Sequence, residues 1–173
     1  MLAYVFSHRP AGGVDIVEYE AALQRFHASL AAGAPRGFLT SSTFRVGDTY
    51  SDWYLVKDSA ALDPLNEAAV SGARTAAHNA AARMAIDGSG KLYTLAGGEP
   101  PPGPGFEIRF SKPAGTSYAD LYERMQPFSS RPGASLWRRM MVLGPPPEFC
   151  LIAPSEVGLP GEYRPELLRR EPI

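Results

Sequence analysis

The sequence contains two related stretches, Phe6-Ser7-His8-Arg9-Pro10-Ala11-Gly12 and Phe110-Ser111-Lys112-Pro113-Ala114-Gly115. Each stretch begins at the aromatic end of a short apolar run, continues into a Pro/Gly turn, and leads into a segment with helical spacing. Two further pairs of segments agree in the same order: residues 37–47 with residues 133–144, and residues 52–56 with residues 148–152. Because several agreements in one order are hard to obtain by chance, we interpret the chain as an internal duplication.

The first half predicts the order strand, helix, strand, strand, helix, strand. Asp15 is well placed to cap a helix with a regular apolar stripe, and Gly33 is placed to end it. A second helical region is expected over residues 62–85, broken near Ser71-Gly72, and the turn Asp87-Gly88-Ser89-Gly90 is expected to follow it. The expected strands cover about residues 2–7, 38–46, 53–56 and 91–95. This order is the ferredoxin-like plan.

The second half repeats strand, helix, strand, strand and then runs short. We expect its second helix to have shrunk to a turn around residues 158–160, followed by a last strand over residues 163–170. The Pro/Gly-rich stretch between the halves cannot form a helix or a central strand, so it is interpreted as a linker. The predicted organisation is a first repeat, a linker and a degenerate second repeat, over residues 1–97, 98–105 and 106–173.

Two ferredoxin-like units in one chain resemble the dimeric α/β-barrel superfamily. The segment Leu65-Asn66-Glu67-Ala68-Ala69-Val70, followed by Ala77-His78-Asn79, is also similar to uncharacterised bacterial members. The resemblance implies an α+β fold in which tandem repeats form an intrachain barrel, with the second repeat truncated. Its members include monooxygenases acting on polyketides and haem, haem-binding chlorite dismutases and peroxidases, lactone isomerases and ligand-binding modules. The resemblance therefore narrows the function little.

His78 is the main candidate for catalysis. Its helical neighbours are nearly all alanine, and such short side chains leave room for a ligand beside the imidazole. The ring could act as a general base, a hydrogen-bond donor or a haem axial ligand. Asn66 and Asn79 on the same helical region could orient a ligand or the ring. Alternatively, the helix packs closely on the sheet, with His78 at its exposed edge and both asparagines solvated.

His8 and Arg138 are two further candidates for ligand binding. His8 ends the first strand, where it could serve a site or could be an ordinary loop histidine. Hydroxyl residues occupy both faces of strand 40–43, whose counterpart in the second half carries Arg138. Facing hydroxyls and guanidinium groups could hold a carboxylate in a polar interior, whereas the alternative is an exposed edge strand with polar decoration.

Composition excludes several classes of protein. The chain has 173 residues, 17 basic and 18 acidic groups and a net charge of −1, which argues against nucleic acid or an anionic membrane as partner. Cys150 has apolar neighbours and no partner for a disulfide, so it is expected in the core. The histidines show no ligand spacing, so no metal is expected, and His27 is interpreted as a partly exposed helix residue. With no signal peptide or membrane span visible, a cytoplasmic protein is expected.

We therefore predict a protein that binds a small organic molecule, as a monomer or a homodimer. If it is an enzyme, the resemblance implies cofactor-independent oxygenation or isomerisation, with His78 as base and Tyr54 or Asn66 as hydrogen-bonding partner. Haem binding through His78 and a structural or assembly module without a pocket are the alternatives. Whether a reaction is catalysed, and with which cofactor, stays open at this point.

Overall fold

A computed structural model describes residues 1–141 and 145–173. The chain divides into two compact units, of which the first contains residues 1–91 and 172–173 and the second contains residues 92–171. Leu143-Gly144, which the proposed duplication matches with Val46-Gly47, lies outside the described residues.

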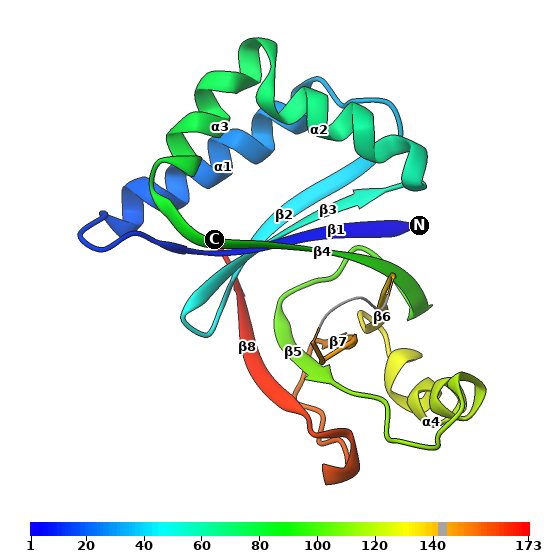
Figure 1. Ribbon diagram of the computed structural model, residues 1–173. Helices are drawn as coiled ribbons and strands as arrows, with labels where there is room; N and C mark the ends of the chain where they lie inside the picture. The colour runs from blue at the N-terminus through cyan, green and yellow to red at the C-terminus, as the bar shows by residue number, and fades with distance from the viewer. Residues whose placement is uncertain (142–144) are drawn as a thin grey trace. The chain divides into compact units, whose positions relative to one another are not determined.

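The first unit has the element order that the sequence predicts. Its helices lie together on one face of its first three strands (Figure 1). Within this layer α3 packs against α1 and α2, and α1 contacts strand β2 of the sheet. The elements, in chain order, are β1 (Leu2–Pro10), α1 (Ile16–Ala32), β2 (Phe38–Val46), β3 (Thr49–Val56), α2 (Leu62–Val70), α3 (Thr75–Ala82) and β4 (Ala85–Gly98), which continues into the second unit.

Helix α1 is defined at both ends by the residues that the sequence indicates. The Asp15 carboxylate accepts hydrogen bonds from the backbone N–H groups of Val17 and Glu18, at 2.8 and 3.3 Å, and so satisfies two free donors of the first turn. Gly33 follows the last turn. The buried face of the helix consists of Tyr19, Ala22, Leu23, Phe26 and Leu30, at helical spacing.

The predicted turn at Asp87-Gly88-Ser89-Gly90 is wrong, because these residues belong to strand β4. The glycines serve close packing rather than a reversal of the chain. A Cβ atom on Gly88 would lie 2.6 Å from Cζ of Phe6, and one on Gly90 would lie 2.6 Å from Oη of Tyr4. Glycine is therefore required here for the close approach of the strand to two aromatic rings of β1.

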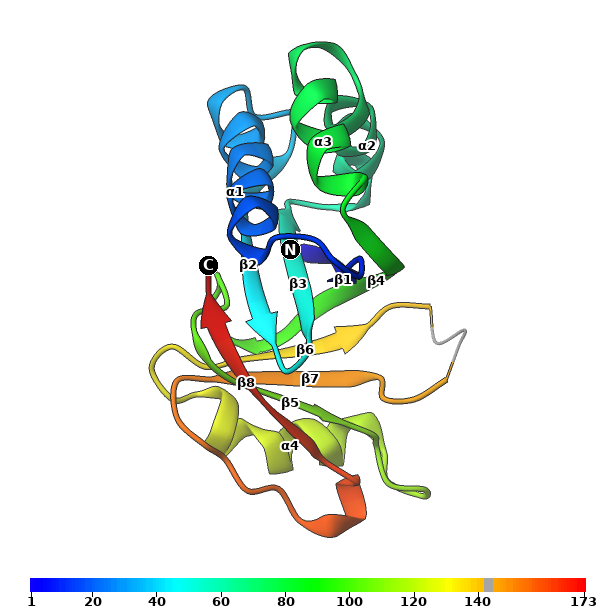
Figure 2. The same cartoon turned by 90° about the vertical axis from the view of Figure 1, so that its left-hand side faces the viewer.

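The second unit contains one long helix, α4, which contacts the strands β6 and β7 (Figure 2). The Ser117 hydroxyl caps α4 by accepting from the Asp120 N–H at 3.1 Å. Between β7 and the last strand there is only a short 3-10 turn, at Gly161–Tyr163. The turn was expected at residues 158–160 and the strand at 163–170, so both lie about three residues later than predicted. Cys150 is buried, as expected. The elements are β5 (Gly105–Phe110), α4 (Tyr118–Ser129), β6 (Ser135–Arg139), β7 (Phe149–Ala153) and β8 (Glu166–Pro172).

The described strands follow the hydrogen-bonded order β1-β3-β2-β8-β5-β7-β6-β4, which closes into an eight-stranded antiparallel barrel. Residues 99–104, between β4 and β5, contain neither helix nor strand. Among the described residues, no helix is long and apolar enough to cross a membrane. The fold is thus of the mixed α+β class, with a barrel and four α-helices in the described part of the chain.

Candidate functional site

Polar and aromatic side chains form rows across three neighbouring strands of the first unit. Strand β3 pairs with β1 on one side and with β2 on the other, both antiparallel, so residues in register share one face of the sheet. Successive rows are two residues apart along each strand, and the three rows on the face toward the helices are Tyr4–Tyr54–Ser41, Phe6–Asp52–Thr43 and His8–Tyr50–Arg45.

Asp52 lies at the centre of these rows and is 3% exposed. Thr43 donates to its Oδ1 at 2.6 Å, and His27 Nε2 lies 3.4 Å from the same oxygen. His8 Nε2 lies 3.1 Å and the Tyr54 hydroxyl 3.3 Å from the other oxygen, Oδ2. A buried carboxylate is costly unless it is paired and hydrogen-bonded, and here three hydrogen bonds and the nearby His27 ring meet it.

The two histidines are held on their far sides as well. The Tyr19 hydroxyl is hydrogen-bonded to His8 Nδ1, and the Ser41 hydroxyl lies 2.7 Å from His27 Nδ1. His27 Nε2 also lies 2.7 Å from the Thr43 oxygen, whose own proton goes to the carboxylate. Both rings are therefore fixed at both nitrogens, which makes the cluster a continuous polar network between α1 and the sheet.

Burial and hydrogen bonding act in opposite directions on Asp52. Burial favours its neutral form, but hydrogen bonds and the electrostatic influence of His27 and His8 outweigh burial and hold its pKa below the ordinary aspartate value. Burial, with the nearby Asp52 charge, raises the pKa of Tyr54 well above that of an ordinary tyrosine, and it raises the pKa of Tyr19 in the same way. The carboxylate is thus kept ionised and both phenols are kept protonated.

A pocket of about 390 Å³, here called the main pocket, opens between this sheet face and the helices. Its volume lies within the range of small-molecule sites, and most of its wall is apolar or aromatic. The sheet supplies Tyr4, Phe6 and Tyr54, and the helices supply Phe26, Leu62, Leu65, Asn66, Ala69, Val70 and His78.

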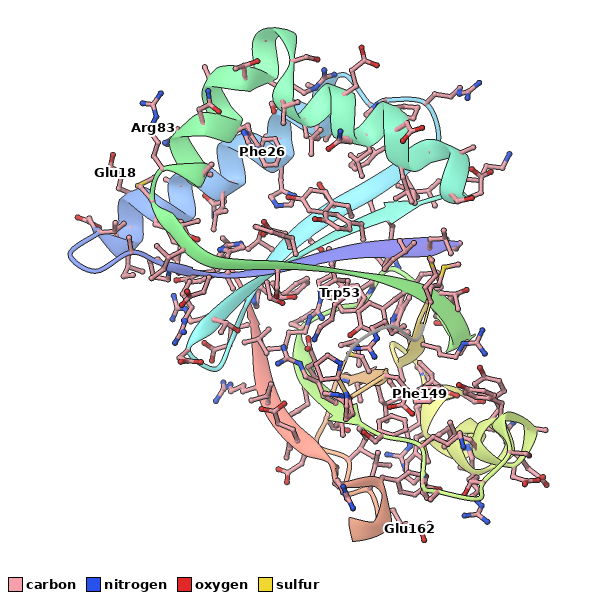
Figure 3. All side chains as sticks on the ribbon, in the orientation of Figure 1. Glu18, Phe26, Trp53, Arg83, Phe149 and Glu162 are labelled. Atoms are coloured by element: carbon pink, nitrogen blue, oxygen red, sulfur yellow. The ribbon has the colours of Figure 1, made fainter. Side chains whose placement is uncertain are left out.

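A second, smaller pocket of about 80 Å³, here called the recess, reaches the polar network. His8 and Asp52 line it, together with four residues that it shares with the main pocket. On the helix side, the recess is lined by Leu23 and Phe26 of α1 and by His78, Ala81 and Ala82 of α3. The shared residues are Phe6, Phe26, Tyr54 and His78. Of these, Figure 3 labels Phe26, which lies in the helical layer.

His78 is half-buried on α3 and borders both the main pocket and the recess. Its ring meets Phe26 edge-on, with centroids 5.5 Å apart. Its Nδ1 lies 3.2 Å from the side-chain oxygen of Asn79. Since an amide oxygen only accepts, this contact places the proton of the neutral imidazole on Nδ1 and leaves Nε2 as an acceptor.

The structure brings most of the predicted site residues to the same part of the first unit. Tyr54, Asn66 and His78 line the main pocket, and His8 lines the recess. Asn79 contacts His78 and lines neither pocket.

Arg138 is not brought to these pockets. It belongs to β6 in the second unit, where its guanidinium lies over the Tyr118 ring, 5.2 Å from the centroid. It lines neither the main pocket nor the recess.

Sequence reasoning missed the centre of the site. Asp52 was not among the candidates, and Thr43 was considered only as one of the hydroxyls of strand 40–43. His27 was expected to be a partly exposed helix residue without a role in a site; it is half-buried, but it is bound within the network. The idea that strand 40–43 is an exposed edge with polar decoration fails for Ser41 and Thr43, which bind His27. The alternation of polar residues two apart along the strands would have indicated a shared polar face.

The residues around His78 do not fit haem well. None of the residues that line the main pocket or the recess is Lys or Arg, so the two carboxylates of a haem would find no cationic partner there. Across residues 1–141 and 145–173, no group of three or more His, Cys, Asp and Glu side chains is arranged to hold a metal ion.

Comparison with known proteins supports the fold. No protein-family model matches the sequence, and no curated protein matches it. Among solved structures, the chain is similar to the crystal structure of a candidate monooxygenase from Lactobacillus acidophilus, with a TM-score of 0.52 and 11% sequence identity. The alignment covers 98% of this chain and 76% of the other. At this identity the likeness concerns the fold alone.

Proposed function

We propose that the first unit binds a small, largely apolar organic molecule in the main pocket and uses His78 as a base toward it. The observation that carries this proposal is the position of His78, which borders both the apolar main pocket and the recess at Asp52. An apolar wall binds the body of a ligand, while the few polar groups at one end orient it. Tyr4, Tyr54 and Asn66 are the other residues at the main pocket with polar side-chain groups, and we propose that Asn66 and Tyr54 orient the ligand.

The chemistry follows from the hydrogen bonds of the imidazole. With Nδ1–H donated to Asn79, Nε2 is the atom that can take a proton from a bound ligand. Removal of a proton from an activated C–H or O–H group prepares a substrate for isomerisation or for direct reaction with oxygen. Cofactor-independent oxygenation or isomerisation is therefore the reaction class that we assign to the site.

Two considerations support this class. The chain resembles the dimeric α/β-barrel superfamily, which contains monooxygenases and isomerases, and it shares its fold with a candidate monooxygenase.

We also propose that the chain consists of tandem ferredoxin-like repeats, the second one truncated. In support, β1 and β5 each lead through a side-chain-capped turn into a helix, at Asp15 and Ser117.

Binding is tested with 2-naphthol, a two-ring probe of suitable size, by isothermal titration calorimetry. Asn66 is exposed and lines the main pocket, so Asn66→Trp should obstruct the pocket without disturbing the core. We expect Asn66→Trp to weaken binding at least about tenfold. The matched control is Glu67→Trp, at an exposed neighbouring position that does not line the pocket, and it should bind as the unaltered protein does.

The base is tested with 2-tetralone, a ketone of similar size whose α-hydrogens exchange with D₂O on enolisation. The protein should accelerate this exchange, as followed by proton NMR, and His78→Gln should remove at least about tenfold of the acceleration, since general bases contribute ~10²–10⁴-fold. Arg83→Gln, at an exposed position directly after α3 that lines neither pocket, is the control. No binding of 2-naphthol, or exchange that is unchanged in His78→Gln, would contradict the proposal.

A further inference from the structure

The recess contains a negatively charged group, and its lining contains no permanently charged cation to neutralise it. Asp52 is ionised, and neither Lys nor Arg lines the main pocket or the recess. The Tyr19 hydroxyl keeps its proton and is hydrogen-bonded to His8 Nδ1, and the Ser41 hydroxyl is hydrogen-bonded to His27 Nδ1. The recess is therefore lined by a carboxylate, with no Lys or Arg in the lining to offset its charge.

The carboxylate itself has little capacity left for a ligand. Three hydrogen bonds already reach its oxygens, from Thr43, His8 and Tyr54. His27 Nε2 lies 3.4 Å from Oδ1 and crowds the remaining space on that oxygen. Asp52 thus acts on a ligand in the recess mainly through its charge. In a site sheltered from water, such a charge repels an anion more strongly than it would in bulk solvent.

Tyr54 is the residue of the network that lines both pockets. Its hydroxyl proton is directed to Asp52 Oδ2 at 3.3 Å, so its oxygen is left with lone pairs. The Tyr54 ring is held in place by stacking on the His27 ring, with centroids 5.2 Å apart. A ligand group that donates a hydrogen bond can therefore meet the Tyr54 oxygen, whereas a group that only accepts finds that proton already engaged.

We propose that the site takes a neutral ring compound bearing a hydroxyl or N–H group, which donates to Tyr54 Oη, and that it rejects carboxylates and other anions. This inference rests on the proposed function, because it specifies the ligand class of the same pocket. It also reverses the expectation that hydroxyls and a guanidinium form a carboxylate site, because Arg138 lies elsewhere and Ser41 and Thr43 bind His27.

The test compares three probes that share one ring system but differ in their polar group. These are 2-naphthol, a neutral donor; 2-methoxynaphthalene, which is neutral without a donor; and 2-naphthoate, an anion. By calorimetry at neutral pH, we expect 2-naphthol to bind at least about tenfold more tightly than 2-naphthoate. It should bind about threefold to tenfold more tightly than 2-methoxynaphthalene, the usual range for one net hydrogen bond.

Two variants assign these differences to residues. In Tyr54→Phe, 2-naphthol should lose its advantage over 2-methoxynaphthalene, and in Asp52→Asn, the disadvantage of 2-naphthoate should shrink at least about threefold. If Asp52→Asn does not fold, the Tyr54→Phe variant and the unaltered protein still decide the question. Binding of 2-naphthoate as tight as that of 2-naphthol would overturn this inference alone, whereas failure of all three probes would overturn the proposed function.

Discussion

The rings of His27 and Tyr54 are stacked, with centroids 5.2 Å apart and planes 15° from parallel, although His27 belongs to α1 and Tyr54 to β3. His27 is itself held by Ser41 and Thr43 of β2. The position of the tyrosine that borders both pockets is thus set by a network that also joins a helix to two strands. Stability of the first unit and the shape of its pocket should therefore respond to the same substitutions.

Asp52→Asn should destabilise the protein strongly near neutral pH. The substitution removes a buried charge whose oxygens are hydrogen-bonded to His8, Thr43 and Tyr54. Leaving buried polar groups without their partner costs about 1–3 kcal/mol, and more where a charged group is involved. The free energy of unfolding, measured by urea denaturation, should fall by roughly this amount. Asp48→Asn, at a carboxylate that is 82% exposed and near Arg9, is the matched control and should change it by less than about 0.5 kcal/mol.

The same carboxylate should make stability depend on acidity. Its pKa is lowered in the folded protein, so as the pH falls through about 4, the ordinary aspartate value, the unfolded chain takes up the proton first. The stabilisation by Asp52 is complete above that value and is lost as the pH falls toward the lower pKa of the folded state. Urea denaturation of the unaltered protein below pH 4 should show this loss, and a pH profile as steep in Asp52→Asn would contradict it.

Both histidines of the network should carry their proton on Nε2 when neutral. His8 Nε2 faces a carboxylate oxygen, which can only accept, so this nitrogen must donate. His27 Nε2 faces the Thr43 oxygen, whose own proton goes to Asp52, so it donates as well. Long-range ¹H–¹⁵N NMR correlations distinguish the two tautomers. His78 provides the internal contrast, because its contact with Asn79 requires the Nδ1–H form; an Nδ1–H signature for His8 would show that the network is ordered differently.

Much of the first unit could be predicted because its elements have local signals. The cap at Asp15, the apolar stripe of α1 and the break near Ser71-Gly72 each lie within a few residues of sequence and appear in the structure. The segment around Gly88 could not be predicted in this way. Its glycines resemble a turn locally, but they are required by aromatic rings more than 80 residues earlier in the chain.

The site was less predictable than the fold, for a related reason. His78 was found because its alanine neighbours are a local signal, whereas the importance of Asp52 depends on its register with Phe6 and Thr43 on two other strands. Register is set by pairing between distant segments, so a single strand does not reveal it. The carboxylate therefore looked like an ordinary strand residue until its partners were in place.

Gly90→Ala should disturb both the stability and the main pocket. The new Cβ would lie 2.6–3.0 Å from atoms of the Tyr4 ring, which must then move, and Tyr4 lines the pocket. We expect a loss of about 1–3 kcal/mol in urea denaturation, the usual cost of overpacking, together with altered 2-naphthol affinity. Gly12→Ala is the control, since no atom lies within 4 Å of its Cβ position, and it should leave both measurements unchanged.

Thr43→Val isolates a single hydroxyl of the network. The substitution keeps the shape of the side chain but removes the donor that meets Asp52 at 2.6 Å and the acceptor that meets His27 at 2.7 Å. Because both partners stay buried and lose a hydrogen bond, the free energy of unfolding should fall by about 1–3 kcal/mol. Thr40→Val is the matched control on the same strand, at a half-buried position that pairs with Leu55 outside the rows. Both variants replace a hydroxyl by a methyl group. Equal losses in the two would therefore mean that the effect comes from the strand and not from the bonds to Asp52 and His27.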